Sequence, residues 1–215
     1  MSKSWNKRKL KEYYESVVEK RLSWIKKDRP TLIRHLEVAR RARILICKRQ
    51  LKVTVLDVRA GFGEILAHLR DLNCYRVACD ISRKALENAK RNADDVVVCD
   101  AEALPIRDGS IDLVLCIEVI EHVISPQTLL KEIKRALHPD GKFILTTPNA
   151  DNKYYKTDEE HLHRFNGEIL AKLINEAGLK VAFVSLIRVQ HRIWFIPLLS
   201  YEETIFVEGG KVEQA

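Results

Sequence analysis

The chain has 215 residues, of which 46% are hydrophobic and 31% charged, a balance typical of a globular protein with a substantial core. No apolar run approaches the roughly 18 residues of a membrane-spanning helix, and the basic start MSKSWNKRKL leads into no apolar signal region. We therefore expect a cytoplasmic protein without a membrane partner.

Positive charge gathers in the first 50 residues. This stretch holds 16 lysines and arginines against 5 acids, whereas the remaining residues hold 21 against 25. Such a segment can meet RNA, anionic lipid or an acidic substrate, and it is also typical of the solvated face of helices. Apolar periodicity predicts two helices over residues 7–27 and 31–49. We expect residues 1–50 to form a basic helical arm or lid.

From residue 52 onward, short apolar strands alternate with helices. This alternation predicts an α/β fold, namely a doubly wound, mostly parallel seven-stranded sheet preceded by the N-terminal helices. We expect this domain to cover residues 51–208 and the tail 209–215 to be disordered. In such sheets ligands bind beyond the carboxyl ends of the strands. The predicted strands are 52–58, 75–80, 95–100, 111–119, 141–148, 179–189 and 201–208.

An acid stands at the end of each of the first three predicted strands. Asp57 ends the first, and the loop that follows contains Gly61 and Gly63, which permit close backbone approach and tight packing. Asp80 ends the second, where a carboxylate can accept hydrogen bonds from a ribose diol. Asp100 ends the third, where an acid can face an adenine amino group. Together they indicate an adenosyl-ligand site.

Four segments in this order resemble the class I S-adenosylmethionine-dependent methyltransferases: VLDVRAGFG, ACDIS, VVCDAEALPIRDGSIDLVLCIEVIEHV and GKFILTTPN. The resemblance implies a Rossmann-like methyltransferase fold with S-adenosylmethionine as cofactor. It implies that the glycine loop holds the methionine end, Asp80 the ribose, and Asp100 with Ala101 the adenine. The predicted cofactor-binding residues are Asp57, Arg59, Gly61, Gly63, Asp80, Ile81, Asp100, Ala101 and Glu118.

Arg59 departs from the family pattern, because it stands where Gly-x-Gly-x-Gly has its first glycine. In one interpretation its side chain turns aside or pairs with the cofactor's carboxylate, and binding survives. In the other it fills the cofactor's place, and the chain is a non-catalytic binding protein. We favour the interpretation in which the chain still binds the cofactor, because the other loop glycines and the acids at the strand ends remain. A nicotinamide-dependent oxidoreductase shares the fold class, but the DAEALP segment disfavours it.

Acids and histidines follow the fourth and fifth predicted strands. If a helical turn starts in EVIEHV, Glu118, Glu121 and His122 lie on one side of it. The segment DEEHLHRF supplies His161 and His163 further on. These side chains can line a substrate pocket, or converge on a divalent metal with open positions. Either arrangement can help a hydroxyl nucleophile lose its proton.

Two further resemblances concern these segments. CIEVIEHV resembles the corresponding segment of the quinone-pathway O-methyltransferases, which implies a hydroxyl of a small molecule as methyl acceptor. Glu118-x-x-Glu121-His122 with a later histidine also resembles the metal site of small-RNA 3′-end 2′-O-methyltransferases. That second resemblance makes His161 the preferred fourth ligand, although aromatic and basic residues of the RNA family are absent around it.

The predicted function is therefore S-adenosylmethionine-dependent methylation of a small-molecule hydroxyl. Glu118, Glu121 and His122 are the predicted catalytic residues, and the same three with His161 are the candidate metal ligands. Two alternatives stay open. One is an RNA methyltransferase that uses the basic residues 1–50, and the other is the non-catalytic binding protein.

Overall fold

The computed structural model describes residues 5–25, 28–152, 160–193 and 196–212. The chain divides into two compact units, Met1–Pro105 and Ile106–Ala215. The basic arm predicted over residues 1–50 belongs to the first of these units. None of the helices in the described ranges is long and apolar enough to cross a bilayer.

The first unit begins with helices α1 (Lys7–Ile25) and α2 (Arg29–Cys47). The break between them falls at Asp28, whose carboxylate accepts a hydrogen bond from the Thr31 amide at 2.9 Å. An aspartate at this position stabilises the start of a helix by satisfying one of its free amides. The two predicted N-terminal helices are therefore present, and α2 begins two residues earlier than predicted.

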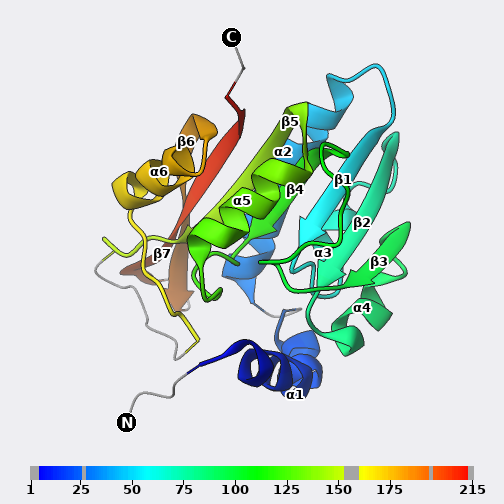
Figure 1. The fold of residues 1–215 in the computed structure, drawn as a ribbon. Coiled ribbons are helices and arrows are strands. Elements are labelled where there is room, and N and C mark those ends of the chain that lie inside the picture. The colour runs from blue at the N-terminus through cyan, green and yellow to red at the C-terminus, as the bar shows by residue number, and fades with distance from the viewer. Residues whose placement is uncertain (1–4, 26–27, 153–159, 194–195, 213–215) are drawn as a thin grey trace. The chain divides into compact units, whose positions relative to one another are not determined.

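Three parallel strands form the sheet of the first unit, in the order β3-β2-β1 (Figure 1). The helix that follows the loop after β1 has only four residues, and turns follow it. Ser82 begins the next helix, and its hydroxyl accepts the Ala85 amide at 3.2 Å. The elements are β1 (Val53–Val58), α3 (Glu64–Ala67), β2 (Cys74–Asp80), α4 (Arg83–Ala89) and β3 (Asp95–Val98).

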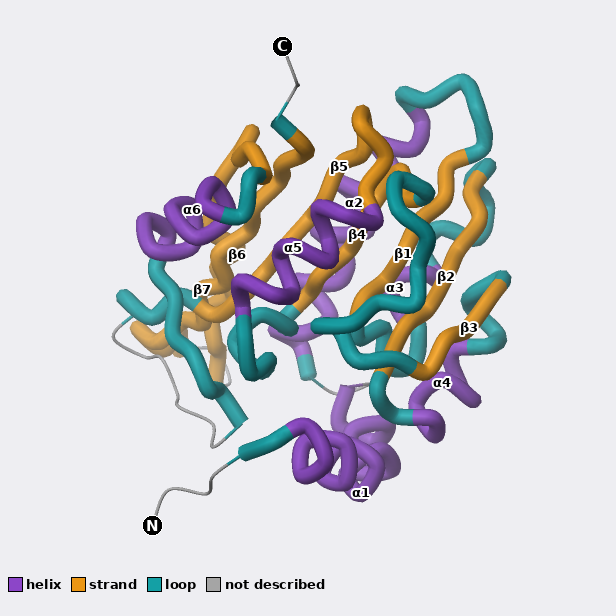
Figure 2. Tube along the Cα trace, viewed as in Figure 1, coloured by secondary structure: helices purple, strands orange, loops and turns teal. Residues whose placement is uncertain are grey.

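Four strands form the sheet of the second unit, in the order β4-β5-β7-β6. β4 and β5 are parallel, whereas β7 runs antiparallel to both of its neighbours. Figure 2 shows α5 lying along β4 and β5. The mostly parallel arrangement of the prediction is thus present, with antiparallel pairing confined to β7. The elements are β4 (Ile111–Ile117), α5 (Pro126–Ala136), β5 (Leu137–Pro148), α6 (Gly167–Glu176), β6 (Leu179–Ile193) and β7 (Ile196–Lys211).

The predicted end of the ordered domain at residue 208 is wrong. β7 continues to Lys211, with Gly209 paired to Phe143 of β5 and to Val181 of β6. Backbone hydrogen bonding on both sides holds a segment whose glycines suggested a loose tail. A Cβ at Gly209 would collide with the Phe143 ring, so the glycine permits close packing. Residues 213–215 of the predicted tail lie outside the described ranges.

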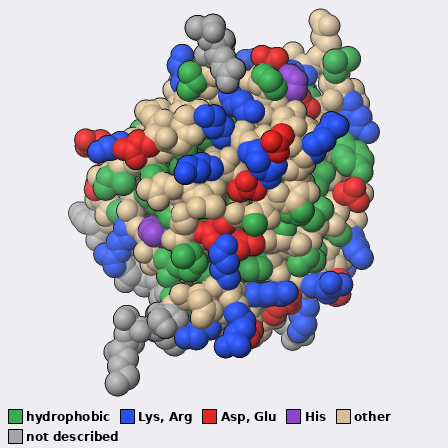
Figure 3. All heavy atoms as spheres, in the orientation of Figure 1, with side chains coloured by type: hydrophobic (Ala, Val, Ile, Leu, Met, Phe, Trp, Pro, Cys, Tyr) green, Lys and Arg blue, Asp and Glu red, His purple; other side chains and the backbone are tan. Residues whose placement is uncertain are grey.

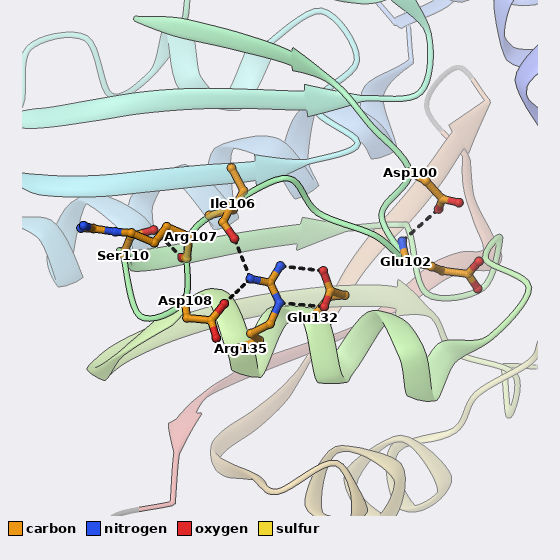
Figure 4. Close-up of polar contacts among 8 residues, drawn as sticks. All are labelled: Asp100, Glu102, Ile106, Arg107, Asp108, Ser110, Glu132 and Arg135. Atoms are coloured by element: carbon orange, nitrogen blue, oxygen red, sulfur yellow. Dashed lines mark hydrogen bonds and ion pairs between the residues drawn. The ribbon is translucent and has the colours of Figure 1, made fainter.

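Arg135 connects α5 to the loop that precedes β4 (Figure 4). Its Nη1 donates to the Ile106 carbonyl at 2.6 Å and to Asp108 Oδ1 at 2.5 Å. Its Nε and Nη2 donate to the Glu132 carboxylate at 2.8 and 2.7 Å. The carboxylates of Glu132 and Asp108 raise the pKa of Arg135. This fork of bonds fixes the loop that leads into the second unit's sheet.

Candidate functional site

Three residues of the loop after β1 have positive φ. Arg59 has φ 62°, Gly61 56° and Gly63 73°. Glycine adopts this conformation without strain, whereas arginine does so at a cost of about 1–2 kcal/mol. A Cβ at Gly63 would lie 3.4 Å from Ala89, so this glycine allows close packing on α4. A Cβ at Gly61 would meet nothing within 4 Å, which leaves open space beside the loop.

Asp80 joins the loop to the end of β2. Its Oδ2 accepts the Gly61 amide at 2.9 Å, and its Oδ1 accepts the Ser82 amide at 2.8 Å. The residue is buried, with 6% of its surface exposed. A carboxylate can accept about four hydrogen bonds, so this role is compatible with the predicted contact to a ribose diol. Ile81, also in the predicted set, follows directly and is half-buried.

Asp57 is a buried acid at the end of β1, with 3% of its surface exposed. Burial raises the pKa of Asp57 well above its ordinary value, and the charges of Glu64 and Asp80 raise it further. Burial also raises the pKa of Glu64, against the opposing effect of backbone amides. A cationic ligand group beside Asp57 would favour its ionised form. The predicted methionine end of S-adenosylmethionine, with its ammonium and sulfonium, supplies such charge.

Asp100 lies beyond β3 beside a second acid that the sequence analysis missed. The Glu102 amide donates to Asp100 Oδ1 at 2.9 Å (Figure 4). Lys7 of α1 places its Nζ 2.7 Å from Asp100 Oδ2 and 2.8 Å from Glu102 Oε2. Hydrogen bonds that the ammonium donates to Asp100 and Glu102 raise the pKa of Lys7. Ala101 between the acids is half-buried. No local pattern links Lys7 to these acids, because the contact joins distant parts of the chain.

Helix α1 also contacts the Arg59 loop. The Arg59 guanidinium carbon lies 4.6 Å from the centre of the Tyr14 ring, within the range of a cation–π interaction. The next residue, Glu15, accepts the Arg83 amide at 2.7 Å at the start of α4. Val18 packs with Phe62 of the loop. Within the first unit, therefore, α1 covers the loop, and the Arg59 side chain is turned onto α1.

Three residues of the second unit form a compact acid–histidine cluster: Glu121, His122 and His161. One potential ligand atom from each lies within 4.8 Å of the other two. His122 Nε2 lies 3.6 Å from Glu121 Oε1, and its Nδ1 lies 3.1 Å from the Glu160 carbonyl oxygen. Since a carbonyl only accepts, Nδ1 carries the proton, and in the neutral imidazole Nε2 then carries the lone pair. Thr147 Oγ1 donates to Glu121 Oε2 at 3.0 Å.

Glu118 and His163 do not join this cluster among the residues that the structure describes. Thr146 Oγ1 donates to Glu118 Oε1 at 2.9 Å, and the Glu118 amide donates to the Thr146 carbonyl at 3.0 Å. His163 Nε2 lies 3.0 Å from the Val123 carbonyl oxygen. The helical turn on which the predicted shared face depended does not start at Glu118, because this residue has φ 55° and lies in a bend before a turn. Of the four candidate ligands, the structure brings Glu121, His122 and His161 together and does not bring Glu118 to them.

Comparisons with known proteins agree on a methyltransferase. Residues 56–145 match the model of the methyltransferase domain family. The chain is 32% identical over 111 residues to the tRNA (carboxymethyluridine(34)-5-O)-methyltransferase ALKBH8 of Macaca fascicularis, covering 50% of this chain and 16% of the relative. It is 36% identical over 100 residues to the malonyl-[acyl-carrier protein] O-methyltransferase of Enterobacter lignolyticus, covering 46% and 40%. The chain thus spans less than half the length of these two relatives.

A solved structure shares the fold. The 1,6-didemethyltoxoflavin-N1-methyltransferase of Burkholderia thailandensis, solved with its substrate and S-adenosylhomocysteine, aligns with a TM-score of 0.69 and 20% identity. The alignment covers 94% of this chain and 87% of that enzyme. This likeness confirms the predicted fold class across both units. The domain match, the relatives and this fold together support the predicted resemblance to the class I S-adenosylmethionine-dependent methyltransferases.

Proposed function

We propose that this chain methylates an oxygen of a small molecule, with S-adenosylmethionine as the methyl donor. The observation that supports it most directly is the set of three acids at the ends of β1, β2 and β3 beside a glycine loop with open space. Both curated relatives carry O-methyltransferase names.

The first unit's residues fit the cofactor's chemistry. Asp57 is a buried acid that a neighbouring cation would ionise, and Asp80 retains capacity to accept from a ribose diol. Asp100 presents a carboxylate to a donor such as an adenine amino group. S-adenosylmethionine, when bound, supplies an electrophilic methyl group. The chain's own task is to hold the adenosyl and methionine ends in a fixed orientation.

His122 is the proposed general base of the second unit. Its Nδ1–H points to the Glu160 carbonyl, so the lone pair on Nε2 can accept a proton from an acceptor hydroxyl. Glu121 Oε1, 3.6 Å from Nε2, stabilises the imidazolium that forms. Thr147 holds the other Glu121 oxygen and so fixes the carboxylate. As in other catalytic histidine bases, a hydrogen bond to one ring nitrogen orients the imidazole, and the other ring nitrogen accepts the proton.

Methyl transfer from labelled S-adenosylmethionine to a panel of phenols and hydroxylated acids tests this function. His122→Gln should lower the turnover of an accepted substrate by about 100-fold or more. His138→Gln, on a half-exposed side chain elsewhere in the second unit, is the matched control and should keep wild-type turnover. Full activity of His122→Gln would remove the general-base assignment.

The same cluster also supports a divalent-metal role, which we propose as a second candidate. A histidine whose other ring nitrogen donates to a carbonyl is oriented as metal ligands are. The 3.6 Å between His122 Nε2 and Glu121 Oε1 is too long for a hydrogen bond. It is close to the roughly 3.3 Å between ligands around a tetrahedral ion with bonds of about 2.0 Å. Two histidines and one carboxylate suit Zn²⁺, Mn²⁺ or Fe²⁺.

Titration with Zn²⁺ and Mn²⁺ tests this candidate without requiring activity. Wild-type protein should bind one ion, and His161→Gln should bind it at least tenfold more weakly. His138→Gln again serves as the control. Equal metal affinity of the wild-type and His161→Gln proteins would exclude a site at this cluster.

An RNA acceptor is the alternative that the basic arm supports. Residues 1–50 hold 16 lysines and arginines against 5 acids, and Lys and Arg side chains lie over much of the visible face, its α1 end included (Figure 3). One relative is named as a tRNA methyltransferase. RNA binding through phosphates would weaken steeply with salt. A gel-shift titration with tRNA at low and high salt tests whether the chain binds RNA in this way. Absence of binding at low salt would leave the small-molecule acceptor.

A further inference from the structure

Lys7 of α1 supplies the cation between two carboxylates at the end of β3. The Glu102 side chain is nearly buried, with 4% exposed, while that of Asp100 is 27% exposed. Two adjacent carboxylates, one shielded from water, repel each other and favour a nearby positive charge. The Lys7 ammonium reaches both, at 2.7 and 2.8 Å.

Both oxygens of Asp100 are engaged in this arrangement. Oδ1 accepts the Glu102 amide at 2.9 Å, and Oδ2 accepts the Lys7 ammonium. An adenine amino group is a neutral donor, so its hydrogen bond to Asp100 is weaker than the charge-assisted bond of an ammonium. An adenosyl ligand must therefore compete with Lys7 for Oδ2.

The position of Lys7 on α1 lets it leave without undocking the helix. Lys7 is the first residue of α1, and its side chain is 54% exposed. The other contacts lie about two turns further on, through Tyr14 with Arg59 and Glu15 with the Arg83 amide. Helix ends fray more easily than the docked interior. Release of Lys7 alone is thus less costly than release of α1.

We propose that Lys7 is a gate on the cofactor site, which competes with adenosyl ligands for Asp100 and lowers their affinity. The inference rests on the proposed cofactor role of Asp100. An exposed ion pair contributes little to stability, so the competition is modest. Because salt screens this pair, the gate opens as ionic strength rises.

Calorimetric titration with S-adenosylhomocysteine, which has no net charge at neutral pH, tests the gate. Lys7→Met should bind about two- to fivefold more tightly than wild type at about 50 mM salt. At about 500 mM salt the wild-type affinity should rise towards that of the variant. Lys7→Arg keeps the charge and should behave like wild type. Lys11→Met, exposed on the same helix, is the matched control.

The outcomes separate the gate from the proposed function. Lys7→Met binding as tightly as wild type, or more weakly, would overturn the gate and leave the cofactor assignment intact. No binding by either protein would overturn both. Circular dichroism of each variant establishes that α1 and the sheet are folded. Should Lys7→Met fail to fold, the salt dependence of wild-type binding still decides: affinity that does not rise with salt overturns the gate.

Discussion

Replacement of Arg59 separates backbone strain from side-chain stacking in the loop after β1. Arg59 has φ 62°, which costs a non-glycine residue about 1–2 kcal/mol. Its guanidinium lies over the Tyr14 ring at 4.6 Å, a cation–π contact worth about 0.5–2 kcal/mol at a partly buried position. Arg59→Ala retains the strain and loses the contact, so it should destabilise the protein by about 0.5–2 kcal/mol.

Arg59→Gly loses the contact but also relieves the strain. It should therefore be more stable than Arg59→Ala by about 1 kcal/mol and lie within about 1 kcal/mol of wild type. Urea unfolding gives these differences, and the melting temperatures of the two variants should differ by about 2–4 °C. An alanine variant at least as stable as the glycine variant would refute the assignment of strain to this residue.

The same variants test whether Arg59 obstructs the cofactor. Because the guanidinium is turned onto Tyr14 of α1, we expect Arg59→Gly to bind S-adenosylhomocysteine no more tightly than wild type. Titration of both proteins under the same conditions measures this directly. Binding that tightens by orders of magnitude in Arg59→Gly would show that the arginine occupies the cofactor's place.

Three further predictions concern stability. Burial raises the pKa of Asp57 above its unfolded value, so the wild type loses stability as pH rises above about 3.8. In urea unfolding at pH 8, Asp57→Asn should therefore be more stable than the wild type. Near pH 3 this difference in stability should be gone. Arg135→Met removes four hydrogen bonds that hold the loop before β4, and calorimetry should show a loss of about 1–3 kcal/mol; an unchanged melting temperature would contradict this role. Gly209→Ala forces a Cβ against the Phe143 ring and should cost about 1–3 kcal/mol, whereas Gly167→Ala, with open space around it, should be neutral or stabilising; equal effects would argue against the packing constraint.

Local sequence patterns predicted the parallel strands and the acids that follow them. Each strand is a short, mostly apolar run with an acid at its end or just beyond it, so Asp57, Asp80 and Asp100 could be placed from the sequence alone. The Ser82 cap and the two N-terminal helices follow from equally local signals. The fold class was predictable because these signals repeat along the chain in a consistent order.

The features that the sequence did not predict depend on contacts between distant segments or on backbone conformation. Lys7 and Glu102 form an ion pair although they lie near opposite ends of the first unit's sequence. Glu118 was expected on a helical turn, but its positive φ and its bonds to Thr146 direct it to β5. The last strand includes Gly209, whose pairing on both sides is invisible in a segment that looks like a flexible tail. Tertiary pairing overrides local preference in each case.

Binding of S-adenosylmethionine to the wild-type protein and to Asp80→Asn tests the central claim most directly. The claim is that the acids at the ends of β1, β2 and β3 hold the adenosyl cofactor. Calorimetry should show saturable one-to-one binding below about 1 mM for the wild type, and at least about tenfold weaker binding for Asp80→Asn. No binding by the wild type at millimolar cofactor, or equal affinity of the two proteins, would contradict it.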